Sequence, residues 1–311
     1  QKTAYEIPKR DWSSDVCSSD LAIGSISDPE IVETNLVTMP GIMNKGLNSR
    51  LIEKCELRGD ALAIVDVKYS YNPEGTNAVA RKPDVDQAIA EIKSYPNTSY
   101  ACTYFPWVLI RDLNNKDVWV PPSVVALGTF SSSQRRTELW FAPAGFNRGG
   151  ISAGAAGLPV TQTAMSLSAK NRDKLYEANI NPIATFPAEG IVIFGQKTLQ
   201  VTPSALDRIN VRRLMIYLKK EISRMASTVL FDPNVKVTWT RFLDMANPFL
   251  ASVQSRFGLT EFRVILDETT TTPDLVDRNI VYAKILLKPA RAIEFIALDF
   301  VITNTGASFA D

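Results

Sequence analysis

The sequence predicts a fold of the α/β class (α+β overall), with a mixed sheet flanked by helices, then two long helices and a small sheet. Two observations predict this fold. Between residues 35 and 110, short apolar runs alternate with amphipathic helical stretches, as in a layered α/β domain. After residue 203, two long stretches of helical periodicity are followed by three strand-like apolar runs.

Residues 35–67 predict a strand, a loop, a helix and a second strand. The helix carries its apolar side chains on one face and ends where glycine is expected, at Gly59. The four side chains of that face are Leu47, Leu51, Ile52 and Cys55. Residues 61–67 (ALAIVDV) then form a short apolar run, typical of a strand buried on both faces.

A second cycle predicts a helix over residues 84–95 and a strand over residues 100–110. A hairpin with Asn114 and Asn115 in its turn should follow, and then a short helix after Pro121 and Pro122. Residues 140–159 predict a loop rich in Gly, Ala and Pro, and residues 173–178 a weak helix. A turn (NPIATFP, residues 181–187) and a strand hairpin (residues 189–199) should follow.

The long helix expected from residue 204 has two faces of different chemistry. Ser204 and Asp207 resemble a capping box at its start. One stripe is apolar, and the opposite stripe is basic, with Arg212, Arg213, Lys219, Lys220 and Arg224. A basic stripe is typical of a solvated face, but it also suits an acidic partner surface, and both alternatives stay open here. A second helix is expected over residues 239–257, kinked or restarted at Pro248.

Three strands are expected at the end of the chain, over residues 261–268, 279–288 and 292–302. The last, AIEFIALDFVI, is apolar on both faces, so both faces need cover. It suits an internal strand of a sheet, and equally a strand given to a neighbouring subunit.

Composition argues against most enzyme chemistry. The 311 residues contain no His, which removes the commonest general base and most zinc ligand sets. The acidic group at residues 267–277 and the glycine-rich run at 149–157 match no calcium loop or phosphate loop. A net charge of +1 and the absence of a long apolar run favour neither nucleic acid nor membrane as a partner. We therefore expect no catalytic, metal or cofactor site.

Residues 1–21 differ from the rest of the chain. Residues 11–21, DWSSDVCSSDL, correspond residue for residue to one reading frame of a common short-read sequencing adapter. We interpret them as an assembly artefact that has no ordered structure, with native sequence resuming near Ala22. Residues 1–10 match nothing that we can place.

The ordered set of motifs from residue 35 to 302 closely resembles contractile tail sheath proteins of bacteriophages, in particular myophage sheath subunits. The motifs that carry the resemblance are TYFPWVLIRDLNNKDVWVPPS, LWFAPAGFNRGGI, INPIATFPAEGIVIFGQKTL, INVRRLMIYLKKEI, VLFDPN and LDETTTTPDLVDRNIVYAKILLKPARAIEFIALDF. Each motif alone is weak, whereas their order along the chain is specific.

The resemblance implies a structural subunit rather than an enzyme. Such subunits stack as six-fold rings around a tail tube, between baseplate and tail terminator proteins, and contract to drive the tube through the host envelope. The implied location is the virion, after assembly in the host cytoplasm. A partial outer domain is expected over residues 22–203 and a tube-proximal domain over 204–311, with a small sheet that neighbouring subunits complete.

The resemblance also assigns candidate interface residues. The implied C-terminal arm, a strand between subunits, consists of Phe295, Ile296, Ala297, Leu298, Asp299, Phe300, Val301 and Ile302. The candidates for contact with the tube or with other subunits are Arg212, Arg213, Lys219, Lys220, Arg241 and Arg256. We expect the family's N-terminal arm to be missing, so that this chain alone cannot form a regular extended sheath. A tailocin or type VI-like sheath, or a His-free hydrolase or phosphotransferase, are the alternatives.

Overall fold

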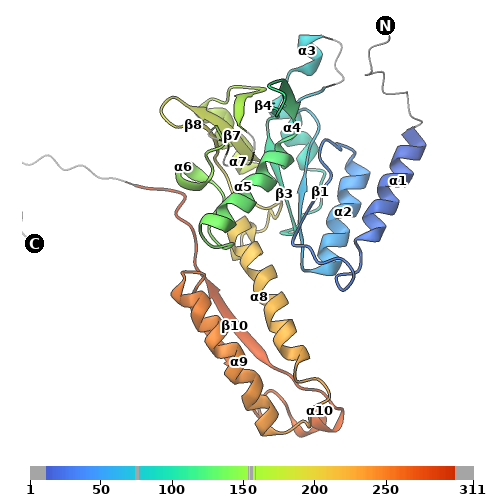
Figure 1. The fold of residues 1–311 in the computed structure, drawn as a ribbon, viewed down its shortest axis with the longest axis vertical. Helices are drawn as coiled ribbons and strands as arrows, with labels where there is room; N and C mark the ends of the chain where they lie inside the picture. Colours follow the sequence, from blue (N-terminus) through green and yellow to red (C-terminus); the bar gives the residue numbers. More distant parts are fainter. Residues whose placement is uncertain (1–11, 74–76, 153, 155–156, 158, 298–311) are drawn as a thin grey trace, which may run out of the picture.

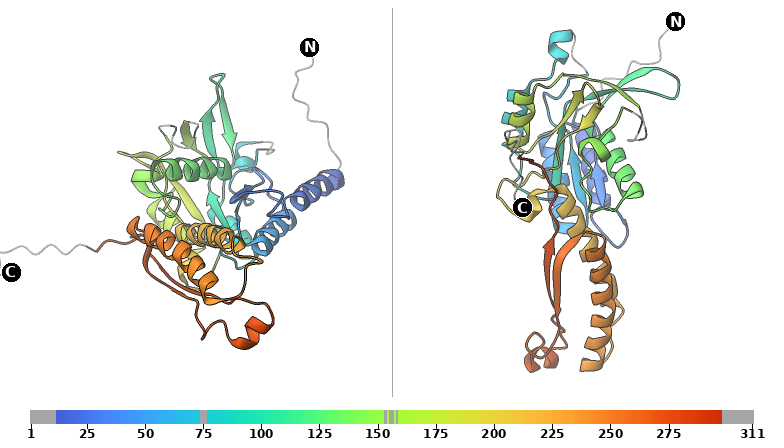
Figure 2. Two further views of the ribbon diagram at one scale, coloured as in Figure 1. Left: turned by 60° about the horizontal axis from the view of Figure 1, so that its bottom comes forward. Right: turned by 90° about the vertical axis from the view of Figure 1, so that its left-hand side faces the viewer.

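The computed structural model describes residues 12–73, 77–152, 154, 157 and 159–297. An α/β body occupies one end of the molecule, and helices α8 and α9 with strands β9 and β10 form an elongated extension at the other (Figures 1 and 2). The helices are α1 Trp12–Ser25, α2 Lys45–Arg58, α3 Ala78–Arg81, α4 Val85–Ile92, α5 Pro122–Arg136, α6 Gly145–Arg148, α7 Ala169–Glu177, η1 Ala205–Asp207, α8 Ile209–Ser227, α9 Lys236–Ser255 and α10 Pro273–Asp277. The strands are β1 Leu36–Thr38, β2 Leu62–Val65, β3 Ala101–Phe105, β4 Val108–Arg111, β5 Asp117–Val120, β6 Val160–Thr163, β7 Asn181–Phe186, β8 Gly190–Ile193, β9 Leu259–Ile265 and β10 Lys284–Pro289.

The body is built on a five-stranded mixed sheet in the order β1-β2-β3-β7-β8. The first four strands are parallel to their neighbours, and β8 runs antiparallel to β7. Alternate residues of β2 point to opposite faces of the sheet, so that Ala63 packs toward α2 and α4 while Leu62 and Ile64 pack toward α5. The sheet is therefore covered on both faces, as the predicted α/β class requires.

Local signals predicted helices α2 and α4 correctly. Asn44 caps α2 by accepting hydrogen bonds from the backbone of Gly46 and Leu47, and Gly59 ends the helix with φ 68°. All four residues of its predicted apolar face are buried. The Asp84 side chain accepts a hydrogen bond from the Gln87 amide at the start of α4, as expected at a helix start.

The strand predicted over residues 100–110 is two strands in two different sheets. It is interrupted by Pro106, which follows a cis peptide bond and has no amide to donate to a ladder. Before it, β3 lies in the main sheet; after it, β4 pairs with β5 and β6 in a separate antiparallel sheet. The predicted hairpin is confirmed as β4–β5, with Asn115 at φ 60° in its turn.

The turn predicted over residues 181–187 is wrong, because residues 181–186 form β7. Two prolines suggested a turn, but the segment pairs on one side with β8, just after it, and on the other side with β3, far earlier in the chain. Only two residue pairs join β7 to β3, and the Asn181 side chain adds hydrogen bonds to the carbonyl oxygens of Thr103 and Lys197, at 3.0 and 2.8 Å. Hydrogen bonds of the Asn181 side chain thus supplement the short backbone pairing between β7 and β3.

The extension consists of α8, α9 and the antiparallel pair β9–β10. The Ser204 hydroxyl caps the short helix η1 through the Leu206 amide, so the capping box opens η1, and α8 begins after it at Ile209. Helix α9 continues through Pro248 without restarting. None of the helices in the described ranges is long and apolar enough to cross a membrane.

Helix α8 belongs to both parts of the molecule. Ile209 and Ile216 pack into the core of the body together with residues of β2, β3 and α5. Leu214 and Leu218 pack instead with Trp140, α9 and β9. The domain boundary expected at residues 203/204 stays a prediction, and α8 is the continuous element that links the two cores.

The segment expected to be without order, residues 11–21, is helical from Trp12 onward as part of α1. Asp20 forms an ion pair with Arg50 of α2, and Ile23, one turn later, is buried in the core of the body. Packing of Ile23 against α2 gives the helix an attachment that the Ser- and Asp-rich composition did not indicate.

A buried carboxyl group, Asp66 at the end of β2, joins three segments of the body. It accepts hydrogen bonds from the Gly41 amide (2.9 Å), the Ser123 amide (3.1 Å) and the Ser123 hydroxyl (2.6 Å). Burial raises the pKa of Asp66 to about 6, although these hydrogen bonds oppose the shift.

We predict that Asp66 makes the stability of the body depend on pH. Because the folded pKa lies above the unfolded value of 3.8, its contribution is fully present below pH 3.8 and is lost as the pH rises through about 6. Relative to Asp66→Asn, the free energy of unfolding of the wild type should fall by at most about 3 kcal/mol between pH 4 and 7. Urea unfolding of both proteins at both pH values measures this change. A stability difference between wild type and Asp66→Asn that is the same at pH 4 and pH 7 would contradict the prediction.

Candidate subunit interface

Two of the six candidate basic residues, Arg212 and Arg213, lie inside the molecule. The Arg212 guanidinium stacks on the Tyr100 ring at 4.0 Å and donates a hydrogen bond to the Ser99 hydroxyl. Arg213 lies over the Phe130 ring at 5.1 Å and donates to the Gln134 side-chain oxygen at 3.0 Å. The exposed basic stripe expected on α8 is therefore wrong at these two positions.

Burial has a direct electrostatic effect on these arginines. It lowers the pKa of Arg212, where Tyr100 and the Glu56 charge oppose the shift, and it lowers the pKa of Arg213 to about 10; neither forms an ion pair with a carboxylate in the described residues. Aromatic faces and neutral oxygens replace the missing anion. These side chains hold α8 against the body.

The other four candidates lie at the surface, and three of them form ion pairs within the chain. Lys220 pairs with Glu33 at 2.6 Å, Arg241 with Asp232 at 2.8 Å and Arg256 with Glu138 at 2.9 Å. Within the described ranges, Lys219 is the exposed candidate that has no acidic partner. Contact of these side chains with a tube stays a prediction.

The predicted terminal strand is not a strand in its described part, residues 292–297. Phe295 and Ile296 are 84% and 77% exposed, and Ala297 is exposed as well. Residues 298–302 of the predicted arm lie outside the described residues. An extended apolar segment forms a strand only where an open edge receives it, and residues 292–297 pair with no strand in the described chain.

The sheet of the extension has only two strands in the described chain. Phe262 and Val264 of β9, with Ile285 and Leu287 of β10, pack on the α8–α9 side. The opposite face carries an exposed ion pair between Glu261 and Lys288 at 2.6 Å, and Leu286 is 45% exposed. Because a two-stranded sheet leaves an unpaired edge on each side, it is a suitable acceptor for a further strand.

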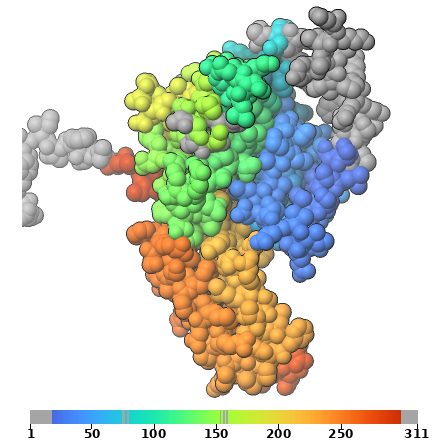
Figure 3. Space-filling model, in the orientation of Figure 1, coloured from blue at the N-terminus to red at the C-terminus, as the bar shows by residue number. Residues whose placement is uncertain are grey.

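Exposed apolar side chains gather on the extension, which protrudes from the body in Figure 3. At its far end they are Leu230, Phe231, Val235, Val237, Ile280, Val281 and Tyr282. Phe231 and Phe257, which flank α9 at its two ends, are exposed and adopt φ of 68° and 63°. A phenylalanine at positive φ is strained, and the described chain gives neither side chain a packing role that offsets this strain.

Sequence reasoning did not single out these two phenylalanines. Phe231 occurs in VLFDPN, a turn between two helices, and Phe257 lies between Arg256, the C-cap of α9, and Gly258. A large aromatic residue in a turn next to Pro or Gly was the available signal. Both residues are candidates for burial by a partner.

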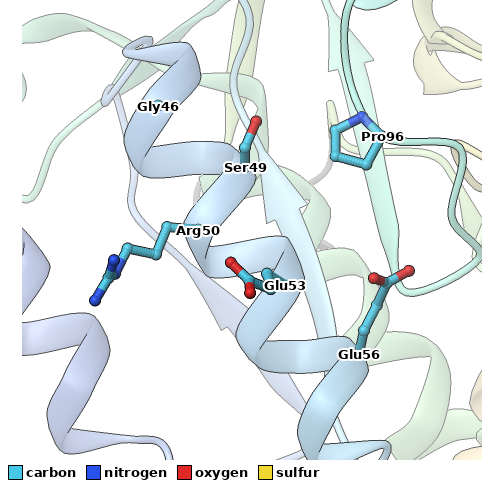
Figure 4. A pocket seen from close by; sticks show the side chains of 6 residues that line it. All are labelled: Gly46, Ser49, Arg50, Glu53, Glu56 and Pro96. Carbon is cyan, nitrogen blue, oxygen red and sulfur yellow. The ribbon is translucent and has the colours of Figure 1, made fainter.

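The hollows on the body do not resemble a catalytic site. One of about 450 Å³ lies along α2, where Arg50 extends away from Glu56 (Figure 4). A second of about 230 Å³ shares Glu56 and continues to Tyr100 and Gln200. In the ranges that the structure describes, no group of His, Cys, Asp and Glu is placed to hold a metal ion.

Comparison with known proteins gives consistent results. Residues 201–303 match the family described as phage tail sheath C-terminal domain. The chain is 34% identical over 304 residues to the tail sheath protein of Vibrio phage KVP40, covering 92% of this chain and 44% of that protein. It is 37% identical over 196 residues to the tail sheath protein of Enterobacteria phage T4, covering 63% and 29%. The chain thus spans less than half the length of these curated relatives.

A solved structure shares the fold. The sheath complex of an extracellular contractile injection system, PVC, in its contracted state superposes with a TM-score of 0.70. The sequence identity is 24%, and the match covers 90% of this chain and 74% of the other. The resemblance and the fold class inferred from the sequence are therefore confirmed.

We predict that Phe231→Asn stabilises the chain while weakening its self-association. Asparagine tolerates positive φ far better than phenylalanine, so the free energy of unfolding should rise by up to about 1 kcal/mol. Loss of an exposed ring should weaken any contact that buries it. Thermal unfolding and sedimentation velocity measure the two effects, with Phe231→Tyr as the control that keeps the ring. A lower melting temperature for Phe231→Asn would show that the ring supports the fold instead.

Proposed function

We propose that this chain forms part of a structural, non-enzymatic subunit of a contractile phage tail sheath, because it is similar to phage tail sheath proteins and its residues 201–303 match the model of their C-terminal domain. The observation that carries the proposal is the 34% identity to a phage tail sheath protein across 92% of the chain. The subunits would polymerise around an inner tail tube and contract to drive it through the host envelope.

The exposed sheet edges and apolar side chains of the extension and the terminal segment support a role in assembly. An unpaired two-stranded sheet and an apolar terminal segment are the two complementary parts of a strand exchange. We propose that residues 295–302 of one subunit add a strand to the β9–β10 sheet of a neighbour. Backbone hydrogen bonds would supply affinity, and alternate side chains such as Phe295 would fix the register.

The proposed partners follow from this role. They are further copies of the subunit in six-fold rings, a tail tube protein, and baseplate and tail terminator proteins. The proposed location is the virion tail, after assembly in the host cytoplasm. Lys219, exposed and without an acidic partner among the residues that the structure describes, is the basic candidate on α8 that an acidic tube surface would contact.

A sheath of a tailocin or another contractile injection system is the second candidate. The similar fold of the PVC sheath favours it, although its lower identity gives it less weight than the phage relatives. Capsid genes beside the gene for this chain would support a phage. A tube gene without capsid genes would support an injection system.

We predict that Phe295→Ser combined with Ile296→Ser weakens self-association without changing the fold. Both side chains are exposed, so the melting temperature should stay the same. Loss of two apolar side chains from a strand interface should weaken association roughly tenfold or more. Sedimentation velocity over a concentration series measures the change.

Leu113→Ser is the matched control, since Leu113 is 99% exposed at the tip of the β4–β5 hairpin, far from the proposed strand. The arm proposal fails if this control weakens association as much as the double variant. The assembly proposal itself fails if the wild-type chain stays monomeric at every concentration.

A further inference from the structure

A bidentate ion pair holds the root of the C-terminal segment against the body. The Glu294 carboxylate accepts two parallel hydrogen bonds from Arg208, from Nε at 2.6 Å and from Nη2 at 2.9 Å. The third nitrogen of Arg208, Nη1, pairs with Asp207 at 3.1 Å. Both side chains of the fork are well covered, with 26% exposure for Arg208 and 16% for Glu294.

The body adds further contacts to the same carboxylate. The Gln196 side chain, in the segment after β8, donates to Glu294 at 3.3 Å. Tyr176 of α7 lies beside it, and burial together with the neighbouring Glu294 raises the pKa of the Tyr176 phenol. Lys197 stacks on the Tyr176 ring at 4.2 Å. Glu294 is therefore seated where α7, the segment after β8 and the start of α8 meet.

The alternation of covered and exposed residues ends at this residue. After β10, the Ala290 amide donates to the Gly258 carbonyl, and Ala292 and Glu294 face inward while Arg291 and Ile293 are exposed. From Phe295 to Ala297, every described residue is exposed. Glu294 is thus the last described residue that the body holds.

We propose that the Arg208–Glu294 fork is an anchor that divides the C-terminal segment into a fixed root, residues 290–294, and a free donor strand that begins at Phe295. Glu294 is a positioning residue in this proposal, because it sets where and in which direction the donor segment leaves its own subunit. The proposal rests on the assembly function proposed above, and it locates the start of the exchanged strand.

The anchor also has a geometric consequence. Bidentate guanidinium–carboxylate pairs restrict both distance and orientation, which a single contact does not. A donor strand that left from a mobile root would sample many directions before it found a neighbour's sheet edge. Fixing the root at Glu294 reduces that search and its entropic cost.

Limited trypsin digestion tests the anchor in the full chain. Arg291 lies in the root, and residues 292–311 contain no Lys or Arg, so cleavage after Arg291 releases one peptide that mass spectrometry quantifies. Cleavage requires the root to leave the body. Glu294→Gln replaces one acceptor oxygen with an amide that faces Arg208, so cleavage should become roughly tenfold faster or more.

A matched control and a double-mutant cycle make the result specific. Glu261→Gln breaks the exposed Glu261–Lys288 pair of β9–β10, which has the same 2.6 Å separation, and should leave cleavage after Arg291 unchanged. Arg208→Gln should match Glu294→Gln, and the double variant should be no faster than either single variant.

Cleavage of Glu294→Gln at the wild-type rate would overturn the anchor, and so would equal acceleration by Glu261→Gln. Sedimentation velocity of the same proteins measures their self-association, so the anchor and the assembly function are tested separately. If the wild type fails to associate, the assembly proposal fails while the cleavage result still decides the anchor. If the wild type associates and Glu294→Gln does so more weakly in parallel with faster cleavage, both proposals stand.

Discussion

The position of α8 depends on two consecutive buried arginines, and the rest of the architecture depends on α8. Neighbouring residues on a helix point about 100° apart, so Arg212 and Arg213 reach two different surfaces, Tyr100 before β3 and Phe130 on α5. Neither forms an ion pair with a carboxylate in the described chain. Rotation of α8 would remove the aromatic faces and leave a buried charge without compensation, which is strongly unfavourable.

This constraint explains how a thin extension can protrude from the body. Its two small cores include Leu218, Val253 and Phe242, and much of its apolar surface remains exposed. A two-stranded sheet is marginal on its own. The extension therefore depends on α8 at one end and, in the proposed assembly, on neighbouring subunits over the rest of its surface. Exposed apolar side chains are expected on an element that is completed by association.

Short-range signals predicted much of the fold, and long-range contacts account for the misses. Gly59, Asp84 and the Asn114–Asn115 turn lie within the elements they define, so their signals are local. By contrast, β7 was missed because Pro182 suggested a turn and because its place in the main sheet depends on β3, far earlier in the chain, although it also pairs with the nearby β8. Amphipathic periodicity assigned Arg212 to an exposed stripe, since no local pattern reveals an aromatic ring more than 100 residues away. The same limit hid the anchor at Glu294, which is separated from Arg208 by 86 residues.

The anchor and the two arginines act on the same end of α8, and this determines how force would travel through a subunit. Arg208 immediately precedes α8, so the root of the donor segment and the first turns of α8 are held at one place on the body. A pull on the free segment beyond Phe295 would reach the body through the Arg208–Glu294 fork, and the β9–β10 hairpin would carry little of it. In the proposed assembly, a movement of one subunit's body would then be transmitted through its donor strand to the neighbour's extension. Linked subunits would move as bodies connected by short strands, which is the coupling that a cooperative change of sheath length requires.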